Sequence, residues 1–421
     1  MERLISLLGL VVMIGLAWLL STHKTRVSPR VVVGGLVLQF AFAFFVMRTG
    51  VGIRLFDAID VAFMALIGCA DAGSRTLFGD DFRDHYLAFS VLPTIVFFSA
   101  FMSIFYYLGV MQWVVGLFAR VMRWTLGTSG AETLSAAANV FVGQTEAPLV
   151  VRPYLASMTM SELNSVMVGG FATIAGGVLA GYADMLAGYE ELGVGAKDLL
   201  AASVISAPAA LLIAKVMQPE VEQPKTLGAV KIEVKDPSVN VLDAIVAGTT
   251  GGLQLALNVG AMLIVFFALI AVVNGLLGWL GVQAHGFGLL GGDAPPAWTL
   301  EAAFGYLFAP MAWLMGVPWG ECLPAGELLG IKWFATEFVA YQRLGEWAAA
   351  DSPVKLSART VTILTYALCG FANFASIGIQ VGGIGGLAPE RRADLAKLGL
   401  RAMIGGSLAG FMTACIAGML L

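Results

Sequence analysis

Charged residues and histidine are scarce in this sequence. Of its 421 residues only 12% are Asp, Glu, Lys or Arg, 58% are hydrophobic, and three are histidine. The mean hydropathy is +0.85. Soluble globular chains have about one quarter of their residues charged, so this composition excludes both a soluble domain and a disordered chain. We interpret the chain as an integral membrane protein.

Patterns for metal, disulfide and nucleic-acid sites are also missing. Four cysteines lie apart in apolar stretches without a CxxC pair, which favours packed thiols and leaves a disulfide framework as the minor alternative. The histidines are far apart and form no recognisable metal site. The net charge is only -4 and no Lys/Arg-rich block is present, so we expect no nucleic-acid partner.

Long stretches without charged residues predict where the chain crosses a membrane, because a spanning helix needs about 17 to 25 apolar residues. Eight stretches fit, at residues 4–23, 31–47, 86–119, 163–183, 199–214, 244–292, 360–389 and 402–421. No small-residue cleavage site follows the first stretch, so we read it as a span and not as a signal peptide.

Three further segments predict special membrane elements. Residues 129–155 and 321–344 are apolar but carry charges and helix breakers in their middle, which suits re-entrant hairpins buried in protein. Residues 53–74 have the mixed pattern of an interfacial amphipathic helix. The predicted fold class is an all-α polytopic membrane protein with eight transmembrane helices, two opposed re-entrant hairpins and interfacial helices.

The distribution of Lys and Arg predicts the orientation, because these residues collect in cytoplasmic loops. Basic residues gather in the loops at 24–30, 120–123, 215–235 and 391–401, whereas residues 283–300 contain none. A few basic residues in the other loops dilute this signal. The balance predicts that both termini lie outside, with eight crossings between them.

An internal repeat relates two parts of the chain. Leu117–Ala136 shares the ordered elements Leu-Phe-Ala, Trp, Gly and Glu-x-Leu-x-Ala with Leu307–Ala325. Further along, Thr145-Glu146 matches Thr336-Glu337, and Gly170-Phe-Ala-Thr173 matches Gly370-Phe-Ala-Asn373. Three predicted crossings separate the copies, so the repeats are inverted. Inverted repeats are typical of secondary transporters whose site lies near the membrane midplane.

The predicted hairpin tips carry the candidate chemistry. In Asn139–Pro148 a carboxylate, a carboxamide and a hydroxyl interrupt an apolar run, and Glu337 holds the matching place in the second hairpin. The repeat predicts that Glu146 and Glu337 converge. Intramembrane carboxylates usually face a pathway or a partner. A structural pair of Glu146 with Arg152, a proton relay and acid-base catalysis remain alternatives, although no HExxH or GxSxG motif supports an enzyme.

Glycine and polar residues in the middle of two spans favour broken helices, at 169–177 and 370–378. Tight helix packing through small residues is the alternative. Asn139 and Thr173 offer side-chain oxygens to a sodium ion, and carbonyls of unwound Val142 and Ile174 offer others, although Asn and Thr also bond helix backbones. Phe371 either stacks on an aromatic ligand or fills the core.

Three motifs together resemble the concentrative nucleoside transporter family in its short bacterial form: Gly143-Gln-Thr-Glu-Ala-Pro-Leu149, Thr336-Glu-Phe-Val-Ala-Tyr341 and Gly370-Phe-Ala-Asn-Phe-Ala-Ser-Ile-Gly378. The resemblance covers nearly the whole chain. It implies a homotrimer with a long tilted sixth helix, which moves nucleosides into the cell with sodium or, in some bacterial members, with protons. It implies no cofactor other than the coupling ion.

The resemblance also implies roles for individual residues. The nucleobase would face Gln144, Thr145 and Glu146, in a pocket lined by Val178 and Phe371. The ribose hydroxyls would bind Glu337, Asn373 and Ser376. The sodium site would comprise Asn139, Val142, Thr173 and Ile174. Relatives also have serine in place of Thr173; because the hydroxyl is retained, we favour sodium over protons.

We therefore predict sodium-coupled nucleoside symport across a bacterial inner membrane, with both termini periplasmic, by an elevator-like alternating-access mechanism. Residues 1–110 (helices 1–3) and 218–295 (a loop and helix 6) would form the scaffold. Residues 111–217 (hairpin 1, helices 4–5) and 296–421 (hairpin 2, helices 7–8) would form the transport domain. A proton-coupled symporter, a passive channel and a membrane enzyme are the alternatives.

Overall fold

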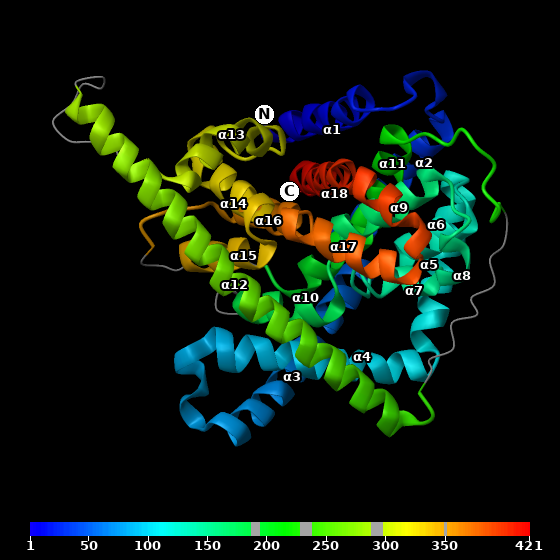
Figure 1. The fold of residues 1–421 in the computed structure, drawn as a ribbon, viewed down its shortest axis with the longest axis horizontal. Helices are drawn as coiled ribbons and strands as arrows, with labels where there is room; N and C mark the ends of the chain where they lie inside the picture. The colour runs from blue at the N-terminus through cyan, green and yellow to red at the C-terminus, as the bar shows by residue number, and fades with distance from the viewer. Residues whose placement is uncertain (187–193, 228–237, 288–297, 349–351) are drawn as a thin grey trace.

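The computed structural model describes residues 1–186, 194–227, 238–287, 298–348 and 352–421. All regular elements in these ranges are helices (Figure 1), which confirms the predicted all-α class. Seven helices or continuous helical segments are long and apolar enough to cross a membrane, and two shorter apolar helices accompany them. The chain is thus a polytopic membrane protein, as its composition indicates.

The first part of the chain contains four helices before the first repeat. They are α1 (Glu2–Leu19), α2 (Pro29–Arg48), α3 (Gly50–Phe78) and α4 (Leu92–Tyr107), with one π-helical turn before α4. Helix α3 includes the predicted interfacial segment. The third predicted span ends at Tyr107 and not near residue 119, because Gly109 adopts a left-handed conformation with φ +78° and turns the chain.

The two repeats contain the same elements in the same order. The first consists of α5 (Val110–Leu126), α6 (Gly130–Ala138), α7 (Ala147–Val150), α8 (Arg152–Leu155), α9 (Met160–Ala172), α10 (Gly176–Leu186) and α11 (Ala196–Met217). The second consists of α13 (Leu300–Leu314), α14 (Cys322–Phe334), α15 (Glu337–Ala348), α16 (Ala358–Leu368), α17 (Phe374–Leu387) and α18 (Arg392–Leu420). Helix α12 (Val241–Gly286) stands between them.

The two segments predicted as hairpins each form a pair of helical arms, and both predicted helix breaks are present. Hairpin 1 consists of α6 and α7–α8, and hairpin 2 consists of α14 and α15. Helix α9 ends at Thr173, whose backbone is extended, and α16 ends before Gly370, which has φ +145°. The two breaks meet, because the Phe371 amide donates a 3.3 Å hydrogen bond to the Thr173 carbonyl.

A buried ion pair anchors the start of hairpin 1. Ser129 and Glu132 form a capping box at the beginning of α6, which satisfies free amides of the first turn. The Nζ atom of Lys215, at the end of α11, lies 2.7 Å from a Glu132 carboxylate oxygen, and both side chains are buried. Hairpin 1 therefore begins at a fixed point on the repeat to which it belongs.

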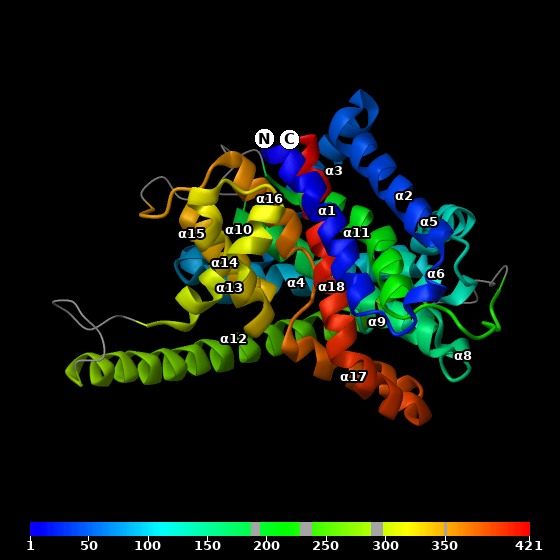
Figure 2. The ribbon, with the colours of Figure 1, turned by 90° about the horizontal axis from the view of Figure 1, so that it is seen from above.

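Helices α4 and α12, of which α4 also contacts α10 of the first repeat, pack along each other (Figures 1 and 2). They approach closely through Gly248 and Gly252 of α12. A Cβ atom at Gly252 would lie 2.7 Å from Ser99 Cβ and 2.9 Å from Val96 Cα. Small residues four apart allow this close packing of helices in a membrane.

Replacing Gly252 with Leu is expected to separate α4 from α12. Overpacking a tight contact costs about 1 to 3 kcal/mol, and here the clash includes backbone, so the thermal midpoint in detergent should fall by several degrees. Gly275 of the same helix is the matched control, because a Cβ there has no neighbour within 4 Å. Equal midpoints for Gly252→Leu and Gly275→Leu would contradict the packing argument.

Candidate functional site

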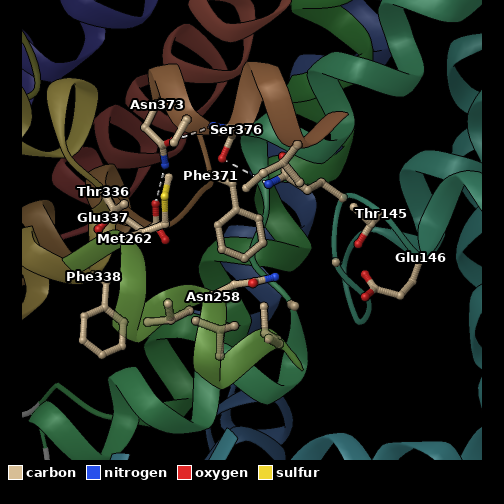
Figure 3. A pocket seen from close by; sticks show the side chains of 18 of the residues that line it. Thr145, Glu146, Asn258, Met262, Thr336, Glu337, Phe338, Phe371, Asn373 and Ser376 are labelled. Carbon is tan, nitrogen blue, oxygen red and sulfur yellow. Dashed lines mark hydrogen bonds between the residues drawn. The ribbon is translucent and has the colours of Figure 1, made fainter. Parts of the chain in front are cut away.

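A cavity of about 270 Å³ lies where the hairpin tips, the two broken helices and α12 meet (Figure 3). Its lining includes every residue that the sequence proposed for substrate binding: Gln144, Thr145, Glu146, Val178, Glu337, Phe371, Asn373 and Ser376. They come from four parts of the chain: the tip of hairpin 1, α10, the start of α15, and the break between α16 and α17 with the first turn of α17. The fold thus brings the whole proposed set to one place, while their binding roles stay predictions.

Glu337 is the buried carboxylate of this cavity, with 5% of its surface exposed. It lies in the first turn of α15, where the helix dipole favours a negative charge. The Tyr182 hydroxyl donates a 2.6 Å hydrogen bond to one carboxylate oxygen, and Asn373 Nδ2 donates a 2.9 Å bond to the other. Each oxygen keeps capacity for a further donor, because a carboxylate offers about four lone-pair sites.

A hydrogen-bond network extends from Glu337 across both repeats. Asn373 Oδ1 caps α17 by accepting a 2.8 Å bond from the Ser376 amide. Gln144 Nε2 donates to the Ser376 hydroxyl at 3.1 Å, and Gln380 Nε2 donates to Gln144 Oε1 at 3.0 Å. The tip of hairpin 1 is therefore held against α17 by polar contacts that a ligand in the cavity would touch.

Glu146 occupies the other side of the cavity from Glu337 (Figure 3). Its side chain is exposed, whereas Glu337 is buried. The predicted convergence therefore amounts to a shared cavity and not to a contact between the carboxylates. No ion pair joins Glu146 to Arg152, both of which the structure describes, so the structural alternative for Glu146 gains no support.

Val178 and Phe371 are the apolar lining residues that the sequence proposed. Val178 on α10 is 1% exposed, and the Phe371 ring projects into the cavity (Figure 3). An aromatic ring at the wall of a cavity offers a face on which a planar ligand stacks.

Several lining residues were not identified from the sequence. Tyr182, Thr336 and Phe338 come from the repeats, and Gln254, Asn258 and Met262 come from α12. Gln254 and Asn258 are polar residues one turn apart in a highly apolar helix, and Gln254 Nε2 donates to Asn258 Oδ1 at 3.0 Å. Their intramembrane polarity was the signal that could have identified them.

The proposed sodium ligands lie where the tip of hairpin 1 meets the break in α9–α10. Asn139 follows α6, and its Oδ1 is buried without a hydrogen-bond partner among the described residues. Thr173 Oγ1 donates to the Gly169 carbonyl at 3.0 Å, and the Gly176 amide donates to the Phe141 carbonyl at 3.0 Å. Val142 lies in this tip, and Ile174 lies in the break and is fully buried.

This oxygen set suits a monovalent hard cation. Free helix ends and unwound carbonyls hold sodium in transporters with broken helices. The orphaned Asn139 Oδ1 is an unused acceptor whose burial is unfavourable without a partner. Among the described residues no group of three or more His, Cys, Asp or Glu side chains forms a transition-metal site.

Family models match almost the whole chain. The Na+ dependent nucleoside transporter N-terminus matches residues 8–81, a nucleoside recognition gate matches 88–189, and the Na+ dependent nucleoside transporter C-terminus matches 198–418. The chain belongs to the concentrative, Na+ dependent nucleoside transporter family. The concentrative nucleoside transporters are a transporter class and not an enzyme class, which removes the membrane-enzyme alternative.

Relatives of this chain include bacterial and vertebrate proteins. An uncharacterized transporter of Haemophilus influenzae is 46% identical, with 100% of this chain and 98% of the relative aligned. Solute carrier family 28 member 3 of Eptatretus stoutii is 44% identical over 100% of this chain. The chain spans only 61% of that vertebrate relative.

Solved structures of one family member, CNTnw, share the fold. Its inward-facing substrate-bound state has a TM-score of 0.90 and 42% identity, covering 100% of this chain and 98% of that one. A variant of the same protein in an outward-facing state also gives a TM-score of 0.90, at 41% identity.

Proposed function

We propose that this family member is a secondary active transporter that moves uridine-like nucleosides into the cell together with sodium. The carrying observation is the cavity that the buried Glu337, held by Tyr182 and Asn373, shares with the apolar side chains of Val178 and Phe371. The polar end of this cavity suits a sugar, and its apolar wall suits a planar base. The Na+ dependent family models support the coupling ion.

The ribose would bind at Glu337. Its carboxylate accepts from the two vicinal hydroxyls of the sugar, while Asn373 and Ser376 offer further polar groups beside it. Hydrogen bonds to a buried charge are stronger than neutral ones, and a site built for them rejects analogues that lack the hydroxyls. Gln144, Thr145 and Glu146 would contact the nucleobase.

Sodium would couple to nucleoside through the tip of hairpin 1. Asn139 and Val142 belong to the proposed ion site, and Gln144, two residues further along the tip, belongs to the nucleoside site. Ion binding that orders this tip favours the arrangement in which Gln144 faces the substrate. Coupling requires only that sodium bind this arrangement better than its alternatives.

The packing suggests which parts would move in an elevator-like cycle. Helix α1 packs along α18, and α2 packs along α11, so both would move with the repeats. This differs from the sequence expectation that all of residues 1–110 belong to the scaffold. Helices α4 and α12, tightly paired through Gly248 and Gly252, would remain as the scaffold.

The interface between these two parts contains the proposed pathway. A second cavity, of about 380 Å³, lies between hairpin 1 and the α4–α12 pair and shares Gly143, Glu146 and Gly251 with the first cavity. A substrate at this interface becomes accessible from one side or the other when the two parts slide. The inward- and outward-facing structures of CNTnw support such a motion.

Oligomeric state and orientation complete the proposal. Helix α12 exposes apolar side chains along its length, including Leu253, Leu257 and Ile264, which fits a homotrimer built around this helix and the lipid beside it. The N- and C-termini lie close together (Figures 1 and 2), and eight crossings would put both on the same side of the membrane. We place both in the periplasm of a bacterium, with the protein in the inner membrane.

Replacing Tyr182 with Phe is expected to lower uridine affinity about tenfold, because Glu337 then loses a charge-assisted hydrogen bond that orients it. Binding of radiolabelled uridine to purified protein measures the change. The control is Tyr154→Phe, on α8 and outside the cavity lining. A Tyr182→Phe protein with unchanged affinity would show that Glu337 needs no help from this hydroxyl.

Uridine uptake into proteoliposomes tests the function directly. An inward sodium gradient should drive accumulation above the external concentration, whereas matched potassium should not. Uptake that follows an acidic exterior without sodium would establish the proton-coupled alternative. Equilibration without accumulation under every gradient would indicate a passive channel.

A further inference from the structure

Lys332 is a buried ammonium group that the proposed transport cycle leaves without a role. It lies in the last turn of α14, only 1% of its surface is exposed, and its Nζ donates a 2.9 Å hydrogen bond to the Ala367 carbonyl. A buried charge is strongly unfavourable unless other charges or dipoles compensate it. The groups around Lys332 must therefore compensate its positive charge.

The end of α16 supplies the compensation. Ala367 is the next-to-last residue of α16, where backbone carbonyls lack partners within the helix and the dipole is negative. A Cβ atom on Gly410 of α18 would lie within 3.9 Å of Lys332 Nζ, the Ala367 oxygen and the Cys369 oxygen, so these three atoms surround one point. Lys332 thus holds a positive charge at the C-terminal end of a broken helix.

Glu337 occupies the opposite end of the same break. It accepts from Asn373, the residue that caps the beginning of α17. The Glu337 carboxylate also attracts the Lys332 ammonium electrostatically. The break between α16 and α17 is therefore bounded by a cation at its negative end and a carboxylate at its positive end.

The first repeat has the same break, but no lysine or arginine occupies the position that matches Lys332. Lys332 precedes Glu337 by five residues, and the residue five before Glu146 is Phe141. Thr173 caps the end of α9, and Asn139, which follows α6, reaches the same helix, because a Cβ atom on Gly169 would lie 3.2 Å from its Nδ2. Neither side chain carries a charge. Ser135 Oγ and Asn139 Oδ1 are buried without partners among the described residues. Near its break the first repeat therefore has neutral oxygen acceptors, whereas the second repeat has the Lys332 ammonium group.

We propose that Lys332 is a built-in cation that takes, at the α16–α17 break, the place that sodium takes at the α9–α10 break. This inference rests on the sodium site of the proposed function. It predicts one sodium ion per nucleoside, because only one of the two related positions is open to an ion. It also makes Lys332 a positioning residue, which acts on the nucleoside through Glu337.

Paired fluxes of radioactive sodium and uridine into proteoliposomes at a fixed membrane potential test this. The wild-type protein should carry one sodium per uridine. Lys332→Asn places a neutral oxygen ligand at the break, so uridine affinity at low sodium should fall about tenfold and recover at high sodium. Its sodium Hill coefficient should rise, and the flux ratio should approach about two sodium ions per uridine.

Lys332→Arg keeps the charge and should preserve the ratio. Lys397→Asn, at an exposed position of α18, is the matched control. If the wild-type protein depends on sodium but Lys332→Asn has the wild-type uridine affinity and flux ratio, this inference is overturned and the proposed function is not. A wild-type ratio of two would overturn it even if the variant failed to fold. Wild-type uptake that ignores sodium would overturn the proposed function, and the inference with it.

Discussion

Replacing Glu337 with Gln is expected to reduce uridine transport by about a hundredfold or more. The change removes the only charge from the acceptor that the ribose diol would use, and it weakens the bonds from Tyr182 and Asn373. Two charge-assisted hydrogen bonds to the sugar are each worth about 1.5 to 3 kcal/mol. Uptake into proteoliposomes and equilibrium binding of uridine both measure this loss.

The substrate analogue 3′-deoxyuridine identifies the reason for the loss. The wild-type protein should discriminate strongly against this analogue, whereas Glu337→Gln should bind uridine and the analogue almost equally, because the partner of the missing hydroxyl is already weakened. Glu346→Gln, on the exposed side of the same helix, should behave like the wild type. Retained discrimination in Glu337→Gln would place the ribose elsewhere.

Replacing Asn139 with Leu is expected to remove the sodium dependence of nucleoside binding. The substitution keeps a similar volume but eliminates Oδ1, the buried acceptor without a partner that the ion would use. In the wild-type protein, replacing sodium by potassium should weaken uridine binding about tenfold or more, the size of a typical coupling. In Asn139→Leu both salts should give the same weak binding.

Asn164→Leu provides the matched control for this variant. Asn164 is also buried, and its Nδ2 also donates to a helix carbonyl, that of Ala214 at 3.1 Å. It lies on α9 but outside the proposed ion site, so the variant should keep sodium dependence even if its stability falls. Sodium dependence that survives in Asn139→Leu and disappears in Asn164→Leu would move the ion site along α9.

The sequence alone determined the class, the elements and eight of the residues that line the cavity. Apolar runs predicted the spans because crossing a bilayer requires a certain length of apolar helix. The segments around Glu146 and Glu337 were recognisable as hairpins because charges and prolines interrupt apolar runs there. These features depend only on residues that are neighbours in the sequence, so a single sequence is enough to recognise them.

Two boundaries show the limits of local patterns. The charge-free run at 86–119 continues past Gly109, although the chain turns there, because two apolar helices joined by a short turn have the composition of one long helix. The span at 360–389 divides into α16 and α17, each too short to cross a membrane alone. Gly370 and Asn373 at the centre of this span indicated the break, but they did not indicate that it meets the break between α9 and α10.

Only the tertiary structure decided which distant groups meet. The bond between Tyr182 and Glu337, the link from Gln380 to Gln144, and the position of Lys332 at the end of α16 join segments from different repeats or helices. The packing of α1 on α18 and of α2 on α11 is of the same kind. Such contacts depend on how helix surfaces fit together in three dimensions, and the spacing of residues along the chain does not specify that fit.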